Sequence, residues 1–493
     1  MSDLNDYRKK IDEIDEKLIG LLGERMKLVQ GIGRLKIKNN LPIESGSREN
    51  EIMARFQNDQ YARELKDIYQ MIFLTSKRLQ KPDYYLVGKS LVYSVSPLIY
   101  QMFGLDGYGL LETEVFPLIK DSEFRGISIT NPFKNEAFLK CDETTETAKK
   151  TAAVNTIMKK NGRMIGENTD YFGFSWLLDH HHLNVSQKKA LIIGNGATSR
   201  TVEQVLKDRN CGEIVKLVRN VRNPDEIPLT DYQKQANADF LINATPYGTF
   251  PNDDVRPLFP LSEFPNLQAV IDVIYNPRVS PLLNEARQNK LKAISGLGML
   301  VAQAAFSLKF WTGKDAVSQI EAVHSAMKRR LANIVLIGMP YSGKSTIGKQ
   351  LSGLLNKPFF DGDAELEKIG FDLPTVLKTQ TVEAFRQKEA KVMSELAKKQ
   401  GIVLATGGGI VLNPEVMKRL GNNGLIVFVN TPLSLLKERV DGTRPLSKTV
   451  GELEDLFIQR IMLYHKYADL VVNENDLPKI TEKINEHLDH QWS

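Results

Sequence analysis

Residues 333–346 have the sequence "NIVLIGMPYSGKST", an apolar run followed by two glycines five positions apart and a Lys-Ser pair. The apolar run predicts a buried strand, and "TIGKQLSGLL" at 346–355 predicts a helix directly after it. A glycine-rich turn between strand and helix lets backbone N–H groups surround a phosphate, with the lysine reaching the β- and γ-phosphates and the serine coordinating Mg²⁺. The stretch therefore predicts an α/β domain that binds ATP through Gly338, Ser342, Gly343, Lys344, Ser345 and Thr346.

A second stretch, "FFDGDAELE" at 359–367, ends a predicted strand with Asp361 and Asp363. Side chains alternate along an extended chain, so both carboxylates are expected on the same side. One carboxylate can act on Mg²⁺ while the other accepts the proton of a hydroxyl group that receives the phosphate. The two stretches together predict phosphoryl transfer.

Four more motifs follow in order: "FRQKE" at 385–389, "TGGG" at 406–409, "RPL" at 444–446 and "RIMLYHKYA" at 460–468. With the phosphate loop and "DGD", they resemble shikimate kinases over residues 332–493. The resemblance implies that Asp363 holds and deprotonates the shikimate hydroxyl, and that Asp361 lies near Mg²⁺. It further implies that Arg386 and Arg460 bind the substrate carboxylate. Gly407, Gly408 and Gly409 would then approach the ring, and Arg444 would cover ATP.

From Tyr84 onward, short β-rich runs alternate with helical ones, which predicts a parallel α/β architecture. In "ALIIGNGATSR", a strand-to-helix turn carries Gly194 and Gly196, with Ala197 and Thr198 beginning the helix, as in a Rossmann-like dinucleotide site. Where NAD enzymes have an acidic residue, the end of the next strand offers Arg219 and Arg222. Arginines there suit the 2′-phosphate of NADP, although two solvated arginines in a turn remain the alternative.

The order of seven motifs identifies the chemistry of this segment: "YSVSPLIY", "GISITNPFK", "AAVNTI", "GENTDYFG", "NATPYG", "DVIYNP" and "GLGMLVAQAAFSLKFWTG". They resemble shikimate dehydrogenases over residues 84–325. The resemblance implies that Lys134 and Asp170 form the catalytic pair, since an alkoxide formed by hydride transfer to a ketone must be protonated. It also implies a substrate pocket made of Ser94, Ser96, Thr130, Asn155, Tyr275 and Gln303.

Residues 4–80 have apolar residues at helical spacing and predict an all-helical segment. Arg25 and Lys36 are 11 residues apart and share one helix face, although cations on such a face can also extend to solvent. The stretches 7–36 and 41–49, with Gln80, resemble all-helical chorismate mutases over 4–81. The resemblance implies that Arg8, Arg25, Lys36, Arg48, Glu49 and Gln80 surround chorismate, with Lys36 and Gln80 acting on the breaking ether bond.

Length and composition fit a cytosolic multidomain enzyme. The chain has 493 residues, 42% of them hydrophobic and 25% charged, and a net charge of +5 without any nucleic-acid-binding motif. Its two cysteines, Cys141 and Cys211, fit no metal or disulfide spacing, which favours the reducing cytoplasm. The run His180–His182 is interpreted as an exposed helix end, because no fourth metal ligand is evident.

Together these patterns predict an all-helical mutase domain at 1–81, a two-lobed dehydrogenase at 82–328 and a P-loop kinase at 329–493. Within the dehydrogenase, we expect a substrate lobe at 82–186, an NADP-binding lobe at 187–295 and returning helices at 296–328. The expected cofactors are NADP(H), ATP and Mg²⁺, and no membrane or nucleic-acid partner is expected.

Three alternatives remain open. The helical segment could be a catalytically silent dimerisation or effector-binding module, because the mutase family's acidic residue before the Arg-Glu pair is Ser45 here. The substrates could be other polyol acids, such as quinate. The third alternative is a nucleic-acid-binding regulator that contains a kinase domain, but the sequence has no motif for recognising nucleic acid.

Helix geometry also predicts a homodimer. Arg8 lies 17 residues before Arg25, roughly 100° around the helix from the face of Arg25 and Lys36. Arg8 therefore cannot readily point into the same pocket of its own chain. We expect it to reach the site of a second copy, as the resemblance also implies.

Overall fold

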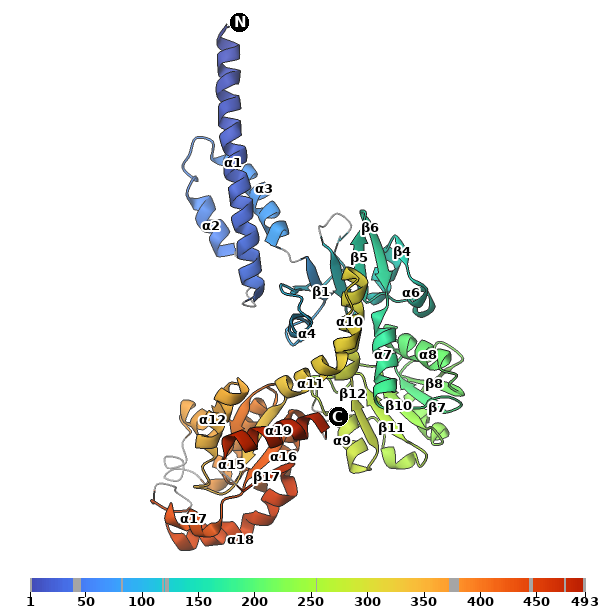
Figure 1. Cartoon of the computed structure of the whole chain (residues 1–493), viewed down its shortest axis with the longest axis vertical. Coiled ribbons are helices and arrows are strands. Elements are labelled where there is room, and N and C mark those ends of the chain that lie inside the picture. Colours follow the sequence, from blue (N-terminus) through green and yellow to red (C-terminus); the bar gives the residue numbers. More distant parts are fainter. Residues whose placement is uncertain are drawn as a thin grey trace. The chain divides into compact units, whose positions relative to one another are not determined.

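The computed structural model describes residues 2–38, 46–80, 83–117, 119, 124–253, 255–371, 381–442, 447–473 and 476–490 (Figure 1). Two residues of the sequence analysis, Ser45 and Arg444, lie outside these ranges. The chain forms two compact units. The first unit comprises Met1–Ser175 and Ala302–Gln319, and the second comprises Trp176–Val301 and Ile320–Ser493.

Three helices begin the first unit: α1 (Ser2–Lys38), α2 (Gly46–Ala54) and α3 (Ala62–Gln80). The prediction of an all-helical segment is therefore confirmed. Helix α1 packs along α3, and their carboxyl ends approach closely at Gly33. A Cβ atom added to Gly33 would lie 2.7 Å from the Gln80 Cα, so only glycine permits this approach without a shift of the backbone.

A mixed six-stranded sheet follows in the first unit, with strand order β2-β1-β3-β5-β6-β4. Its strands are β1 (Tyr84–Gly88), β2 (Gly109–Glu112), β3 (Gly126–Ile129), β4 (Glu143–Thr144), β5 (Thr156–Lys160) and β6 (Arg163–Glu167). Strand β1 pairs in parallel with β2 and β3, as predicted, but β5 runs antiparallel to β3 and β6. Asn161 and Gly162, both at positive φ, make the two-residue turn of this hairpin, so the parallel expectation is wrong here.

Several helices lie between or after the strands of this sheet along the chain. They are α4 (Ser96–Met102), α5 (Lys134–Lys140), α6 (Glu146–Thr151), α7 (Thr169–His180) and α10 (Leu297–Thr312). Along the chain, α7 and α10 each cross a boundary between the two units.

The second unit contains a six-stranded sheet of order β12-β11-β10-β7-β8-β9, in which all neighbouring strands are parallel. Its strands are β7 (Lys189–Ile193), β8 (Glu213–Val218), β9 (Glu226–Pro228), β10 (Phe240–Asn243), β11 (Ala269–Asp272) and β12 (Lys292–Ser295), with helices α8 (Ala197–Asp208) and α9 (Pro281–Gln288). The central strands β10 and β11 are buried at every position, including the polar residues Asn243 and Asp272 at their carboxyl ends. The Rossmann-like expectation is therefore confirmed for this lobe.

The second unit also contains a five-stranded parallel sheet of order β14-β15-β13-β16-β17. Its elements are β13 (Asn333–Ile337), α12 (Lys344–Leu355), β14 (Phe359–Asp361), α13 (Gly362–Lys368), α15 (Val382–Ala397), β15 (Val403–Ala405), α16 (Pro414–Asn423), β16 (Gly424–Val429), α17 (Leu433–Glu438), α18 (Val450–Tyr467), β17 (Leu470–Val472) and α19 (Leu477–His490). Successive residues of β13 enter two different cores, Ile334 with α12 and α19, Val335 with α15, α16 and α18. Helices thus cover both faces of the sheet.

Helix α11 (Ile320–Leu331) leads into this last domain and is fastened to it at its carboxyl end. The buried Lys357 ammonium donates to the carbonyl oxygens of Arg329, Arg330 and Ala332, at 2.8, 2.9 and 2.8 Å. A cation here complements the negative end of the helix dipole. Helix α11 also packs on α19, where Lys328 donates to the Asp489 carbonyl. Among the described residues, no helix is both long enough and apolar enough to cross a bilayer.

Candidate active sites

The phosphate loop connects β13 to α12 as predicted. Gly338 and Gly343 both have positive φ, and a Cβ on Gly338 would lie 2.8 Å from the Val429 carbonyl oxygen. The buried Lys344 ammonium folds over the loop and donates to the carbonyl oxygens of Gly338 at 3.1 Å and Met339 at 2.8 Å. The loop backbone and the lysine charge therefore converge on the amino end of α12, where a phosphate is favoured.

Ser345 and Asp361, the two residues expected at Mg²⁺, are direct neighbours. The Ser345 hydroxyl donates to Asp361 Oδ2 at 2.5 Å. Asp361 ends β14 and caps α13, accepting from the Asp363 backbone N–H at 3.1 Å. Asp363 thus lies in the first helical turn, so the argument that both aspartates belong to one extended chain is wrong.

The glycine run after β15 makes room for a charged cluster. A Cβ on Gly409 would lie 2.0 Å from Arg386 Nη2, and one on Gly407 would lie 2.3 Å from Glu389 Oε1 and 3.3 Å from Asp363 Oδ1. Arg386 donates to Glu389 at 2.6 Å. The structure therefore brings the predicted glycines, Asp363 and Arg386 together.

Glu389 and Arg460 are the buried members of this cluster, with 2% and 4% of their surface exposed. Burial raises the pKa of Glu389, although the nearby charge of Arg386 opposes the rise. Arg460 is close enough for its charge to act on Glu389, and Tyr464, one turn further along α18, donates to the Gly408 carbonyl at 2.5 Å. The two guanidinium groups therefore share one cluster with the carboxylates of Glu389 and Asp363.

In the first unit, Lys134 and Asp170 form an ion pair between the amino ends of α5 and α7. Their side chains are 14% and 11% exposed. Asn155 donates from Nδ2 to Asp170 Oδ1 at 3.0 Å and to Gln303 Oε1 at 3.4 Å. Four of the predicted dehydrogenase residues therefore make one connected set.

Residues that the sequence analysis missed support this set. Asn155 Oδ1 accepts from the Thr169 backbone N–H at 2.7 Å, and the Thr169 hydroxyl lies 2.8 Å from the Ser307 hydroxyl. The fully buried Tyr100 hydroxyl lies 3.2 Å from the Ser128 hydroxyl, and burial raises its pKa to about 12. The motif "GENTDYFG" contains Thr169, but only the fold reveals its contact with Ser307.

The remaining predicted residues of this lobe lie nearby in the same unit. Ser94 donates to the Ser96 hydroxyl at 3.2 Å, where α4 begins. A Cβ on Gly88 would lie 2.5 Å from Thr130 Cγ2, so Gly88 makes room for Thr130.

The dinucleotide turn lies between β7 and α8, as predicted. Gly194 has φ 105°, and Gly196 caps α8. Arg219 and Arg222 are exposed on the loop after β8. The buried Glu226 organises that loop: it accepts from the Arg222 backbone at 2.6 Å and from Asn195 of the glycine turn at 3.3 Å. Sequence reasoning missed Glu226 because a glutamate in a polar loop gives no distinctive pattern.

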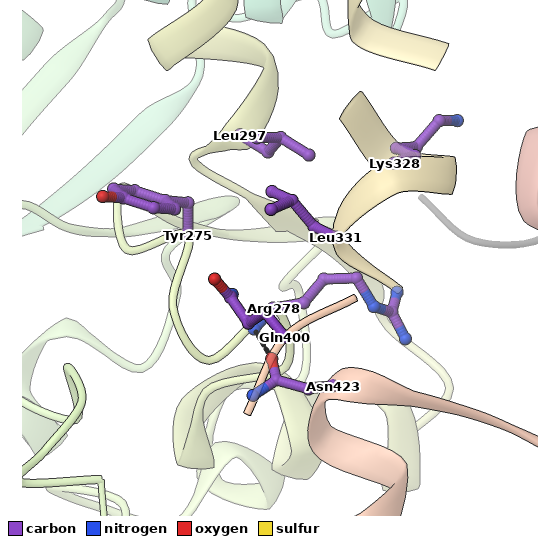
Figure 2. Close-up of a pocket in the computed structure, with 7 residues that line it drawn as sticks. All are labelled: Tyr275, Arg278, Leu297, Lys328, Leu331, Gln400 and Asn423. Atoms are coloured by element: carbon purple, nitrogen blue, oxygen red, sulfur yellow. Dashed lines mark hydrogen bonds between the residues drawn. The ribbon is translucent and has the colours of Figure 1, made fainter. Parts of the chain in front are cut away.

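Tyr275 lies in the second unit, in a small pocket drawn in Figure 2. Arg278 and Leu297 line this pocket together with Lys328 and Leu331 of α11. Gln400 and Asn423, from the domain built on the five-stranded sheet, complete the lining. The backbone N–H of Arg278 donates to Asn423 Oδ1 at 2.9 Å, and that of Val279 donates to the Asn422 carbonyl at 3.0 Å. The loop that carries Tyr275 is therefore hydrogen-bonded to the kinase-like domain.

The three-helix segment gathers part of its predicted site along α3. Arg25 donates to the Ser76 hydroxyl at 2.5 Å, and Gln80 donates to the Ser76 carbonyl at 3.3 Å. Glu49 of α2 pairs with Lys77 at 3.1 Å.

The other three predicted mutase residues are less enclosed. Arg48 is exposed and pairs with Glu51, Lys36 is partly buried on the last turns of α1, and Arg8 is exposed near the amino end of α1.

Comparison with known proteins agrees with this arrangement. Family models match in four places: chorismate mutase type II at 7–81, the shikimate dehydrogenase substrate binding domain at 86–157, the shikimate 5′-dehydrogenase C-terminal domain at 296–321 and shikimate kinase at 340–489. A shikimate dehydrogenase (NADP(+)) of Methanococcus maripaludis is 34% identical over 224 residues, 42% of this chain and 80% of that protein. A shikimate kinase of Dechloromonas aromatica is 41% identical over 151 residues, 29% of this chain and 82% of that protein.

A solved chorismate mutase/shikimate 5-dehydrogenase fusion protein from Clostridium acetobutylicum is 28% identical, with a TM-score of 0.47 over 50% of this chain and 96% of that one. The families follow one another along the chain in the order that the motifs predict. The chain thus belongs to the shikimate dehydrogenase and shikimate kinase families and carries a type II chorismate mutase domain ahead of them, as a trifunctional enzyme of the shikimate pathway.

Proposed function

We propose that the residues gathered in these three sites carry out three reactions. They are the rearrangement of chorismate to prephenate, the NADPH-dependent reduction of 3-dehydroshikimate to shikimate, and the phosphorylation of the shikimate 3-hydroxyl by ATP. The observation that carries the proposal is the Lys134–Asp170 pair, which is fixed by Asn155 and nearly closed to solvent. The enzyme would work in the cytoplasm, where NADPH and ATP are supplied.

In the dehydrogenase, NADPH supplies the hydride that the ketone carbon accepts. The Lys134 ammonium, held by Asp170, then gives a proton to the oxygen that becomes the hydroxyl, and the neutral amine regains a proton from solvent. Asn155 holds the second oxygen of Asp170 and so fixes the direction of the pair. Ser94, Ser96, Thr130 and Gln303 would hold the rest of the substrate.

The choice of NADPH would depend on Arg219 and Arg222, whose guanidinium groups suit the 2′-phosphate. Glu226 supports this role because it accepts hydrogen bonds from the arginine loop and from the glycine turn, holding the two together. Gly194, Gly196, Ala197 and Thr198 would face the pyrophosphate at the amino end of α8.

In the kinase, Asp363 would accept the proton of the shikimate hydroxyl as that oxygen attacks the γ-phosphorus. Arg386 and Arg460 would bind the shikimate carboxylate, and Glu389 would hold Arg386 in place through its hydrogen bond. Lys344 would leave its loop carbonyls for the β- and γ-phosphates, and Arg444 would cover the nucleotide. Gly407, Gly408 and Gly409 would let the ring approach the backbone.

The donor chemistry of Ser345 and Asp361 fits Mg²⁺, which prefers hydroxyl and carboxylate oxygens and retains several waters. The Ser345 hydroxyl and the Asp361 carboxylate are hydrogen-bonded neighbours at the end of the phosphate loop, so these two residues would hold the cation. When bound, Mg²⁺ would neutralise charge on the β- and γ-phosphates.

In the mutase, no covalent step by the protein is needed. Arg25, Arg48 and Lys36 would bind the two carboxylates and the ether oxygen of chorismate, and Gln80 would donate a hydrogen bond to that oxygen. The contacts of Arg25 and Gln80 with the same residue, Ser76, support a common site. Glu49 would act beside them, held by Lys77.

The exposed apolar seam of α1 supports a homodimer. Leu4, Tyr7, Ile11, Ile14, Leu18 and Leu21 are all at least half exposed. Their spacing alternates three and four residues, which is the heptad pattern of a two-helix interface. Helix α1 is roughly 55 Å long and α3 only about 28 Å, so α3 cannot cover the whole of α1. A second copy of α1 would cover the seam and bring Arg8 into the partner site.

Product identification tests the three activities. The full chain, given NADPH, ATP and 3-dehydroshikimate, should form shikimate 3-phosphate, and given chorismate it should form prephenate. Lys134→Ala should stop phosphate ester formation from 3-dehydroshikimate but not from added shikimate. Asp363→Asn should accumulate shikimate. Failure to form prephenate would favour a silent helical module, and faster oxidation of quinate than of shikimate would reassign the dehydrogenase.

Complementation tests the shared mutase site. Arg8→Ala and Lys36→Ala chains should each be nearly inactive as mutases. After subunit exchange, half the dimers would be hybrids with one intact site, restoring about a quarter of wild-type activity under random two-fold assembly. No recovery despite demonstrated exchange would contradict a shared site.

A further inference from the structure

The histidine run at the end of α7 meets two further metal-binding side chains that the sequence does not bring near it. His180 is the last residue of α7, and Glu321 and His324 lie in the first two turns of α11. Their ligand atoms all lie within 4.8 Å of one another, and His180 Nδ1 is 2.8 Å from Glu321 Oε1. All three residues belong to the second unit, and none is among the residues predicted for the three active sites.

The spacing on α11 suits chelation. Residues three apart share one helix face, so Glu321 and His324 can bind the same ion, as Glu-x-x-His pairs do in helical metalloproteins. Two imidazoles and one carboxylate are a frequent ligand set for Zn²⁺, with water in the fourth position. Glu321 is 62% exposed and His324 is buried, so the cluster has one open side and one closed side.

The surroundings hold both imidazoles in place. Trp176, one turn before His180, stacks on the His180 ring at 4.5 Å and meets the His324 ring edge-on at 5.6 Å. His324 is buried, so its ring lies on the closed side of the cluster.

The charges facing the cluster are mixed. Glu321 is its anion, and the His181 ring lies beside that of His180, with 4.8 Å between the ring centroids. Two lysines oppose a cation, but both ammonium groups are engaged: Lys328 with the Asp489 carbonyl and Lys292 with the His181 carbonyl. Because one carboxylate faces two lysines, we expect a moderate rather than an extreme affinity for Zn²⁺.

We propose that His180, Glu321 and His324 bind one Zn²⁺ that fastens α7 to α11. Ligand atoms of a tetrahedral zinc site lie about 3.3 Å apart, since each Zn–N or Zn–O bond is about 2.0–2.2 Å. Small rotations of the exposed Glu321 and of His180 would reach this arrangement. The ion would join the last helix before the NADP-binding lobe to the helix that is fastened to the kinase domain.

Equilibrium dialysis of the full chain against micromolar Zn²⁺, without nucleotide, tests the proposal by metal analysis. Wild type should retain one equivalent more than Glu321→Gln and His180→Gln, and it should melt at a higher temperature with Zn²⁺ than without. His182→Asn is the matched control: it removes a neighbouring histidine outside the cluster, and Asn tolerates the positive φ of that position. This variant should bind as wild type does.

Co²⁺ gives a second readout, because a tetrahedral site with nitrogen and oxygen ligands produces visible absorption bands. His324→Gln should lose these bands while dehydrogenase and kinase activities persist. Equal Zn²⁺ retention by wild type and Glu321→Gln, or binding that depends on His182 instead of His180, would overturn the proposal. Either result would leave His180 and Glu321 as a simple ion pair.

Discussion

Gly409 shows at the scale of one residue how the kinase site is packed. Because a Cβ there would lie 2.0 Å from the Arg386 guanidinium, Gly409→Ala should displace Arg386 from Glu389. We expect the Michaelis constant for shikimate to rise at least tenfold, while that for ATP changes little. Gly353→Ala is the control, since nothing lies within 4 Å of a Cβ added there. Equal rises for both substrates would indicate general unfolding instead.

Arg219 allows a second test at this scale. If its guanidinium contacts the 2′-phosphate, Arg219→Ala should raise the Michaelis constant for NADPH by roughly 10- to 100-fold, since a charged hydrogen bond contributes about 1.5–3 kcal/mol. The constant for NADH should stay nearly unchanged. Steady-state kinetics with both coenzymes measures this, and Arg209→Ala, which breaks a distant ion pair with Asp179, is the control. Equal effects on the two coenzymes would contradict the assignment.

At the scale of an element, the carboxyl end of β11 carries a titrating group. Asp272 is fully buried, and burial raises its pKa to about 7 despite hydrogen bonds from Ser280, Ile274 and Asn243. In the unfolded chain this carboxyl would titrate near 3.9. Between these values the folded state binds more protons, so the free energy of unfolding should fall as pH rises from about 4 to 7.

Asp272→Asn should remove this decline, because the amide does not titrate. The difference in melting temperature between wild type and Asp272→Asn should therefore change steadily between pH 4.5 and 7.5. Asp315→Asn, at an exposed turn, should follow wild type. A constant difference across the range would show that Asp272 is ionised throughout.

Local sequence patterns predicted the elements and much of each site. The phosphate loop and the dinucleotide turn could be found because each depends on a short motif with fixed geometry, whereas the pairing of Lys134 with Asp170 was implied by the resemblance to shikimate dehydrogenases. Glu389, Ser307 and Glu226 could not, since their contacts join elements that only the fold brings together. The β5–β6 hairpin was missed although Asn161-Gly162 is a strong turn signal, because alternation of strands and helices was given more weight.

At the scale of the whole molecule, the proposed dimer predicts that only one activity depends on protein concentration. Dissociation would separate Arg8 from the partner site but leave the other sites within each chain. Mutase activity per chain should therefore fall on dilution into the range of the dissociation constant, while dehydrogenase and kinase activities per chain stay constant. Ile14→Lys, which places a charge in the seam, should lower the mutase activity per chain to the value of the diluted wild type at every protein concentration. If this variant kept the mutase activity per chain of the concentrated wild type, the seam would be contradicted.

The attachment of α11 determines where the kinase can be separated from the rest of the chain. Sequence motifs placed the boundary at residue 329, inside α11, but Lys357 caps the end of that helix and Met327 is completely buried. An expressed fragment that begins at Ile320 should therefore fold and phosphorylate shikimate. One that begins at Arg329 would lose most of the helix and should aggregate or resist purification. Limited proteolysis of the intact protein should accordingly spare the bonds between 320 and 332.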